Sequence, residues 1–163
     1  CQQEGALDTA LLFMLRTMTP EGLRRIADVG EGLENRLLRA AQTANGREDL
    51  LKKVKCKRYT YARLSRILTQ ALLGLTRELA DENPLPAYAR LLGFRRQARP
   101  LLAEIGKRAS VPVVTRAAKF LEKGGAPFAL DVRAGDVWAL GVQADALRGG
   151  RRDLTQRVLI VES

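Results

Sequence analysis

The feature that most constrains the fold is a long amphipathic stretch in the middle of the chain. From Leu64 onward, apolar residues recur at spacings of three and four, which places them on one side of an α-helix. These positions are Leu64, Ile67, Leu68, Ala71, Leu72, Leu75 and Leu79. Such a stripe is stable only when it packs against other apolar residues. We therefore expect one long central helix over residues 60–79, with other elements packed around it.

Shorter helices are expected before this central helix. The same periodicity predicts helices over residues 8–18, 30–46 and 47–55. Thr19 and Pro20 predict one more helix start, with threonine as N-cap and proline at the first helical position. Asp8 is a candidate cap for the first helix. Glu31 and Glu34 are expected in the first turn of the helix at residues 30–46, paired with Arg36 or Arg39.

The pattern changes after residue 83. Residues 81–86 contain two prolines and three turn-forming residues, which cannot continue a helix. Beyond them we expect a short helical segment at residues 88–94, a helix at 98–108 and strands at 111–115, 128–132 and 157–161, while residues 137–140 fit helix or strand. The expected fold class is mainly α, with a helical domain over residues 1–83 and a small mixed α/β lobe over residues 84–163.

A dense run of basic residues lies at the entrance of the central helix. Residues 47–66 hold eight Lys or Arg against Glu48 and Asp49, a net of +6, in a chain with a net charge of +10 and a pI near 10.3. Charge concentrated in this way favours a polyanion such as a nucleic acid as partner. Two further basic groups, at residues 95–108 and 148–152, fit plain solvated surface equally well.

The chain contains no histidine, which removes several classes of catalytic site. His-based general bases, His metal ligands, Ser–His and Cys–His pairs and the HxGH nucleotide-binding motif are all excluded. Cys1 and Cys56 cannot form a disulfide framework or a CxxC metal pair, which fits a cytoplasmic protein. No apolar run reaches the roughly 18 to 20 residues of a membrane span, so we expect no membrane partner.

Four runs of residues carry a resemblance to a known family. They are VGEGLENRLLRAA, KCKRYTYARLSRILTQALL, YARLLGF and LDVRAGDVWALG. In this order and spacing they resemble the C-terminal half of the bacterial tRNA(Met) cytidine acetate ligases. The resemblance implies an N-terminal HxGH-type domain that uses ATP, with magnesium, to activate acetate as acetyl-adenylate and then acetylates N4 of the wobble cytidine in elongator tRNA(Met). It also implies a helical C-terminal part that helps to hold the tRNA.

The missing HxGH motif sets the role that this chain is expected to play. The resemblance places the ATP-binding catalytic domain upstream of a sequence that begins at Cys1 rather than at a methionine. We therefore expect no catalytic residue, metal site or cofactor here, and a tRNA-binding portion that is inactive alone. Two alternatives remain open: a stand-alone basic helical module that binds nucleic acid without enzymatic activity, and an interaction domain whose charge only ensures solubility.

The resemblance and the charge together select candidate RNA-binding residues in EGLENR and KRYTYAR. Arginine and lysine neutralise phosphates, tyrosine can stack on an unpaired base, and a helix N-terminus attracts an anion. The candidates are Arg36, Lys55, Lys57, Arg58, Tyr59, Thr60, Arg63 and Arg66. Simpler roles compete: Tyr59 and Tyr61 fit core or rim packing, since only one of them can face a groove, and Thr60 fits a plain N-cap.

Overall fold

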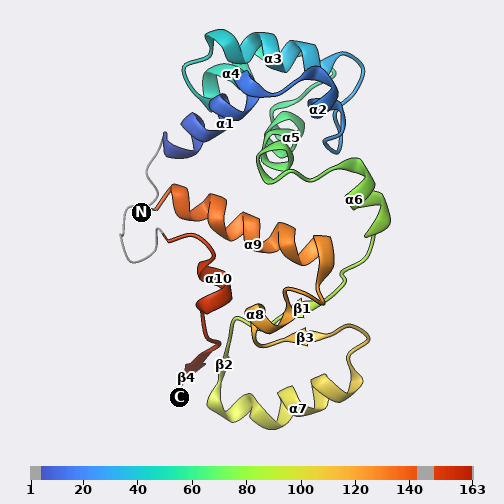
Figure 1. Ribbon diagram of the computed structural model, residues 1–163, viewed down its shortest axis with the longest axis vertical. Coiled ribbons are helices and arrows are strands. Elements are labelled where there is room, and N and C mark those ends of the chain that lie inside the picture. Colours follow the sequence, from blue (N-terminus) through green and yellow to red (C-terminus); the bar gives the residue numbers. More distant parts are fainter. Residues whose placement is uncertain (1–4, 143–148, 163) are drawn as a thin grey trace.

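The computed structural model describes residues 5–142 and 149–162, and within them helices dominate. Figure 1 shows α1 to α4 gathered at one end, α5 and α9 across the middle, and the short strands with α7 at the other end. The mainly α fold class is confirmed. Among these described residues, no helix has the length and apolar character needed to cross a membrane.

The first five helices pack around one apolar core. They are α1 (Ala6–Thr17), α2 (Pro20–Arg24), α3 (Leu33–Thr43), α4 (Arg47–Val54) and α5 (Tyr61–Leu73). Eighteen buried residues form the core, and Leu23, Leu64 and Ile67 within it are fully buried. The helix start predicted at Thr19 is confirmed, because its hydroxyl accepts a hydrogen bond from the Gly22 backbone N–H at 3.1 Å.

Asp8 caps a different helix from the one predicted. Its Oδ2 accepts a hydrogen bond from the Arg47 backbone N–H at 2.9 Å, at the start of α4, whereas no side chain caps α1. Gly46, the N-cap residue of α4, has no side chain for this purpose, so a carboxylate from α1 supplies the acceptor. Asp8 therefore ties α1 to α4.

Glu31 precedes α3, whereas Glu34 lies in its first turn as predicted but does not have the predicted partner. Glu34 is 2% exposed, and its Oε1 accepts a hydrogen bond from Arg24 Nε at 2.9 Å instead of from an arginine of its own helix. Burial raises the pKa of Glu34, whereas hydrogen bonds from backbone N–H groups and Arg24 lower it. The lowering effects together are larger, so the pKa lies below its ordinary value. The pair links α2 to α3.

The prediction of one unbroken central helix is wrong. α5 ends at Leu73, Gly74 adopts φ 70°, and a separate helix, α6 (Arg77–Glu82), begins after Thr76, whose hydroxyl accepts a hydrogen bond from the Leu79 N–H at 3.2 Å. A positive φ suits glycine and ends the helix as a C-cap. The buried stripe of α5 is therefore shorter than predicted and comprises Leu64, Ile67, Leu68 and Ala71.

The C-terminal lobe contains two small parallel sheets. β1 (Ala89–Arg90) pairs with β3 (Val113–Val114), and β2 (Gly93–Arg95) pairs with β4 (Leu159–Val161). The strands predicted at residues 111–115 and 157–161 are thus confirmed, but the helical segment predicted at 88–94 is wrong, because β1 and β2 occupy it. These strands form because they pair in parallel with segments far along the chain, and the local spacing of apolar residues does not indicate such pairing.

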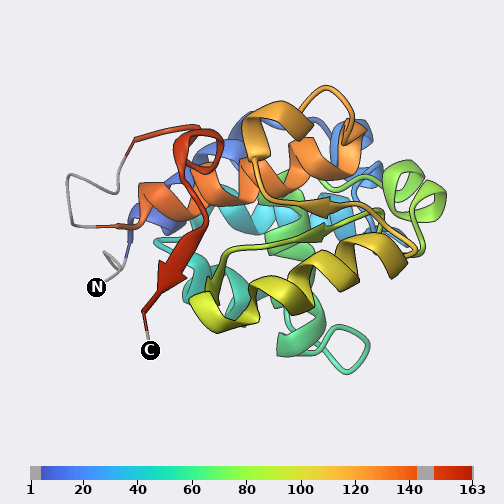
Figure 2. The ribbon, with the colours of Figure 1, turned by 90° about the horizontal axis from the view of Figure 1, so that it is seen from below.

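Helices surround these strands. They are α7 (Arg99–Arg108), preceded by the short 3-10 helix η1 (Arg96–Ala98), then α8 (Ala117–Phe120), α9 (Gly125–Leu140) and α10 (Arg152–Thr155). The helix predicted at residues 98–108 is confirmed as α7. Figures 1 and 2 agree in placing β1 and β3 between α7 and α9.

The strand predicted at residues 128–132 lies inside α9 and is therefore wrong. Phe128 and Val132 are both buried and four residues apart, which fits one side of a helix as well as the alternation of a strand. Residues 137–140, which fitted either structure, are also part of α9. α9 packs against α5 and thereby joins the lobe to the N-terminal helices.

The lobe has its own small core and one buried charge network. Tyr88, Phe120 and Phe128 pack together with ring centroids 5.1 to 5.5 Å apart, and Phe128 meets both other rings edge to face. Arg90 lies beside them and donates to Asp131 at 3.2 Å and to Asp153 at 2.8 Å. Burial, together with the neighbouring Asp131 carboxylate, raises the pKa of Tyr88 to about 12. This network connects β1, α9 and α10.

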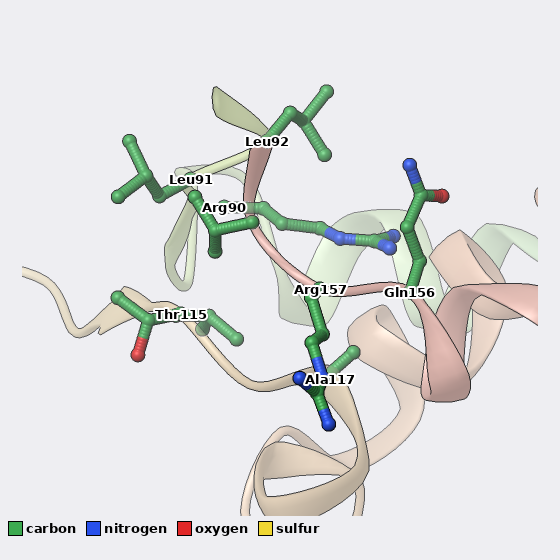
Figure 3. A pocket seen from close by; sticks show the side chains of 9 residues that line it. Arg90, Leu91, Leu92, Thr115, Ala117, Gln156 and Arg157 are labelled. Atoms are coloured by element: carbon green, nitrogen blue, oxygen red, sulfur yellow. The ribbon is translucent and has the colours of Figure 1, made fainter. Parts of the chain in front are cut away.

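A small pocket lies where the two sheets approach each other. Figure 3 shows Leu91 and Leu92, Thr115 and Ala117, and Gln156 and Arg157 around it, with Arg90 extending toward Gln156. Its volume is about 20 Å³, enough for one water molecule but not for a nucleotide. This pocket is a packing gap, and the candidate site lies elsewhere.

Candidate nucleic-acid interface

A tight turn between α4 and α5 presents the centre of the basic segment. Backbone hydrogen bonds between Cys56 and Tyr59, 3.1 and 3.2 Å long, close this turn over residues 56–59. Lys57 and Arg58 are exposed at its tip. Backbone N–H groups of Tyr59 and Arg58 reach the Cys56 thiol and lower its pKa. The turn is thus a rigid support for two cations, and we name residues 55–60 the basic turn.

Thr60 ends the basic turn as the N-cap of α5. Its hydroxyl accepts a hydrogen bond from the Arg63 backbone N–H at 3.3 Å, so the plain capping role is confirmed. Tyr59 is only 5% exposed, and its hydroxyl donates to the Gly30 carbonyl at 3.4 Å. Its ring is therefore a core element and is not accessible for base stacking. Tyr61, at 38% exposure, is the accessible tyrosine of the pair.

The lysines of α4 are paired within their own helix. Lys52 lies 2.9 Å from Glu48, and Lys53 lies 2.8 Å from Asp49, both at the i,i+4 spacing. The hydrogen bond with Glu48 raises the pKa of Lys52, and the same bond lowers the pKa of Glu48. Much of the positive charge on α4 is thus balanced locally.

Two predicted RNA-binding arginines are paired with carboxylates from a distant loop. Arg58 contacts Glu31, and Arg66 Nε lies 3.1 Å from Asp28 Oδ2. Both carboxylates belong to residues 27–32, the loop between α2 and α3. Sequence reasoning missed these pairs because about thirty to forty residues separate the partners. Both pairs are exposed to solvent, so a phosphate can displace the carboxylate at little cost.

Four other candidates have no carboxylate partner among the described residues. The Lys55 ammonium lies 4.6 Å from the Tyr61 ring centre, and the Arg63 guanidinium lies 5.2 Å from that of Tyr59. Arg36 donates to the Lys55 carbonyl at 3.5 Å, while Lys57 extends into solvent. The structure therefore brings Arg36, distant in sequence, to the basic turn.

The loop of residues 27–32 forms one wall of a groove beside the basic turn. The groove has a volume of about 540 Å³ and also exposes Arg63 and Gln70 of α5 and Arg77 and Asp81 of α6. Arg77 was not predicted as a site residue, because it was placed within one unbroken helix instead of at the start of α6. In the sequence, the two glycines of DVGEG, residues 28–32, are what indicates a loop at this side of the groove.

The second basic group, around α7, is a weaker candidate. Arg96 pairs with Glu162, while Lys107 and Arg108 lie 3.0 and 3.7 Å from Glu104. Arg95 and Arg99 are exposed. In the third group, Arg148 lies outside the described residues, whereas Arg151 and Arg152 lie at the start of α10. We therefore keep the basic turn as the candidate interface.

The residues present do not match an ATP or metal site of the HxGH kind. The motif requires histidines, and the chain has none. Among the described residues, no group of three or more Cys, Asp or Glu side chains is arranged to hold a metal ion. The sites predicted to bind RNA consist instead of arginines, lysines and aromatic rings, which bind phosphates and bases.

Comparisons with known proteins identify similar chains. A protein-family model described as HIGH Nucleotidyl Transferase matches residues 1–153. The tRNA(Met) cytidine acetate ligase of Acetivibrio thermocellus is 34% identical over 155 residues, covering 91% of this chain and 37% of that protein. The ligase of the same name from Thermoanaerobacter pseudethanolicus is 36% identical over 141 residues, covering 85% of this chain and 35% of that protein.

Solved structures show the same similarity. The crystal structure of Thermotoga maritima TmcAL bound with alpha-thio ATP superposes with a TM-score of 0.87 at 27% identity, covering 97% of this chain and 42% of that chain. An apo form of the same protein gives a TM-score of 0.85 at 26% identity. The chain thus spans little more than a third of the length of the curated relatives it matches.

Proposed function

The chain belongs to the HIGH nucleotidyl transferase family, and from this premise we propose that it is the C-terminal, tRNA-binding portion of an ATP-dependent ligase. The ligase would form N4-acetylcytidine at the wobble position of elongator tRNA(Met), from acetate through acetyl-adenylate, in the cytoplasm. The names of the relatives support this assignment. The observation that carries the RNA-binding role is the cluster of exposed cations without carboxylate partners around the basic turn.

Catalysis is assigned to another part of the protein. ATP, with magnesium, would bind to the domain that bears the HxGH motif, and that motif cannot lie in a chain without histidine. This chain would contribute affinity and orientation, because a correctly held RNA presents its reacting base at low entropic cost. Incubation of the isolated chain with ATP, acetate and tRNA should therefore yield no acetylated cytidine, and any acetylation would overturn this division of roles.

The basic turn is suited to the RNA backbone for a physical reason. Lys57 has no carboxylate partner among the described residues, so a phosphate binds it without breaking an ion pair. Arg58 exchanges the exposed Glu31 carboxylate for a phosphate. Lys55 and Arg63 lie over tyrosine rings, which restrict their side chains before the RNA arrives. The sequence-independent part of tRNA binding would come from these contacts.

Alanine substitution of Lys57 and Arg58 together tests the proposal. Affinity for tRNA should fall, and the slope of log affinity against log salt should decrease by about one to two, since each phosphate contact contributes roughly 0.7 to 0.9. Helicity should not change, because both side chains lie on the exposed turn and not in the stripe of α5.

The matched control replaces Lys52 and Lys53 by alanine. This variant loses the same formal charge, but its lysines are already paired with Glu48 and Asp49. It should bind tRNA more tightly than the Lys57→Ala/Arg58→Ala variant. Equal losses would mean that only net charge matters, and an unchanged slope in a folded Lys57→Ala/Arg58→Ala variant would exclude the basic turn. Equal affinity for tRNA and for duplex DNA would support the stand-alone nucleic-acid-binding module.

A further inference from the structure

The groove beside the basic turn has the dimensions of a ligand site. Its volume of about 540 Å³ lies within the range of roughly 300 to 1,000 Å³ that is typical of sites for small molecules. Residues 27–31 form one side, α5 the second and α6 the third. We name it the α5–α6 groove.

The loop side of the groove has a strained and well-supported backbone. Asp28 and Glu31 adopt φ values of 64° and 60°, a region that residues other than glycine seldom occupy. An antiparallel bridge between Ile26 and Thr76, and a 3.0 Å hydrogen bond from Ala27 N–H to the Leu75 carbonyl, hold the loop in this shape. Strain that the surroundings maintain is concentrated at binding sites, so the groove is a preformed cleft.

The lining of the groove includes two guanidinium groups that can bind an anion. Arg63 and Arg77 both line it, and neither has a carboxylate partner among the described residues. Arg77 donates one N–H to the Val29 carbonyl at 2.8 Å, which fixes its guanidinium and leaves its other donors available. Two guanidinium groups held in this way fit a phosphate.

The remaining lining offers hydrogen-bond acceptors. Asp81 has no hydrogen-bond or ion-pair partner among the described residues, and Asp28 also faces the groove. Gln70 donates from Nε2 to Asp28 at 3.4 Å, while its buried Oε1 has no partner. The exposed Asp81 carboxylate suits a base edge with an exocyclic amino group, such as N4 of cytosine or N6 of adenine, and disfavours the carbonyl oxygens O4 of uracil and O6 of guanine.

We propose that the α5–α6 groove binds one unpaired, amino-bearing nucleotide, cytosine or adenine, of the RNA held by the basic turn. The phosphate lies between Arg63 and Arg77, and the amino group donates to Asp81. The groove is contiguous with the basic turn through Arg63, whose ring partner Tyr59 belongs to that turn. This inference rests on the proposed function, because it takes the nucleotide to be part of a bound RNA.

Base preference measured with trinucleotides tests the inference. The whole chain should bind CCC or AAA about tenfold more tightly than UUU, within the range of roughly 1 to 3 kcal/mol expected for base-edge discrimination. Asp81→Asn should abolish this preference, because an amide both accepts from an amino group and donates to a carbonyl. Arg63→Gln should lower the affinity for all three trinucleotides and reduce the salt slope by about one, with the preference retained.

Glu78→Gln is the matched control for Asp81→Asn. Glu78 lies on the same helix, is exposed and does not line the groove, so its loss of charge should leave the preference unchanged. Equal affinity of the wild-type chain for CCC, AAA and UUU would overturn the inference. So would an Asp81→Asn variant that keeps the wild-type preference.

Two further comparisons separate the outcomes. Binding of CCC at least tenfold more tightly than free CMP assigns the groove to RNA, whereas equal binding assigns it to a free nucleotide and overturns that part of the inference. If Lys57→Ala/Arg58→Ala leaves tRNA binding unchanged, the basic turn is excluded as the RNA-binding surface and that part of the proposed function fails. If that variant behaves as expected while trinucleotides show no base preference, the groove inference alone fails.

Discussion

The N-terminal helices and the C-terminal lobe bury their apolar residues to very different degrees. Within residues 5–142 and 149–162, eighteen buried residues form one core among α1 to α5, whereas the lobe cluster has four, centred on Phe128. Among the described residues, most exposed large apolar side chains belong to the lobe. They are Leu85, Leu92, Leu101, Ile105, Trp138, Leu140, Leu159, Ile160 and Val161, against Phe13 and Tyr61 in the N-terminal part.

This difference shows where stability originates. The N-terminal helices cover their own apolar stripes, and their stability follows from that core. The lobe holds two-stranded sheets, which are marginal alone, and depends on three aromatic rings, the Arg90 network and the packing of α9 on α5. The division of the chain into a helical region of residues 1–83 and a lobe of residues 84–163 packed on it stays a prediction, and the following experiments test how far the two parts unfold together.

The largest effect is expected from Phe128→Ala. The side chain is fully buried between Tyr88 and Phe120, and its removal should lower the free energy of unfolding of the lobe by about 3 to 5 kcal/mol. Trp138, the only tryptophan, lies in α9 where this helix meets α1 and α5, so its fluorescence reports on the docking of the lobe, while far-ultraviolet circular dichroism reports on all helices. In urea, fluorescence should change before the dichroism does. Coincident transitions would show one cooperative unit.

A matched leucine pair comes next. Leu64→Ala in α5 removes a fully buried side chain and should lower the free energy of unfolding by about 2 to 5 kcal/mol. Leu101→Ala in α7 removes one that is 61% exposed, so it should change stability by no more than about 0.5 kcal/mol. Urea midpoints of both variants measure the contrast. Similar losses would mean that α7 is more tightly packed in solution than its exposure indicates.

The buried Glu34 gives a pH-dependent effect of intermediate size. Arg24→Gln should lower the free energy of unfolding at pH 7 by about 1 to 3 kcal/mol, because it leaves a buried carboxylate without its partner. The folded pKa of Glu34 lies below the ordinary glutamate pKa of the unfolded chain, so its stabilising contribution is fully present above that ordinary pKa and is lost as pH falls through the folded pKa. The difference between wild type and variant should therefore shrink at pH 3. A pH-independent difference would point to packing instead.

The smallest effects concern helix caps. Thr60→Ala removes the acceptor for the Arg63 N–H and should cost about 1 kcal/mol, and Thr60→Ser should restore most of it. Thr76→Ala should cost less, because α6 has no buried residue to transmit its fraying to a core. Thermal unfolding followed by circular dichroism compares the three. A larger loss from Thr76→Ala would show that the bridge at Ile26 matters more than the cap.

The sequence by itself determined the features that depend on near neighbours. Helical spacing located α1, α3, α4 and α5, Thr19 and Thr60 marked helix starts, and the basic residues before Thr60 located the candidate interface. These signals act within about four residues, the reach of a helical turn and its caps, so a sequence displays them completely.

Only the tertiary structure decided the features that depend on distant residues. α5 ends at Gly74, just before Thr76 forms a β-bridge with Ile26. Phe128, within α9, packs its ring against Tyr88, forty residues earlier in the chain. The site changed in the same way: Glu31 pairs with Arg58, and Tyr59 is buried. Such contacts arise from packing between segments far apart in the chain, and a local pattern of residues does not encode which segments will meet.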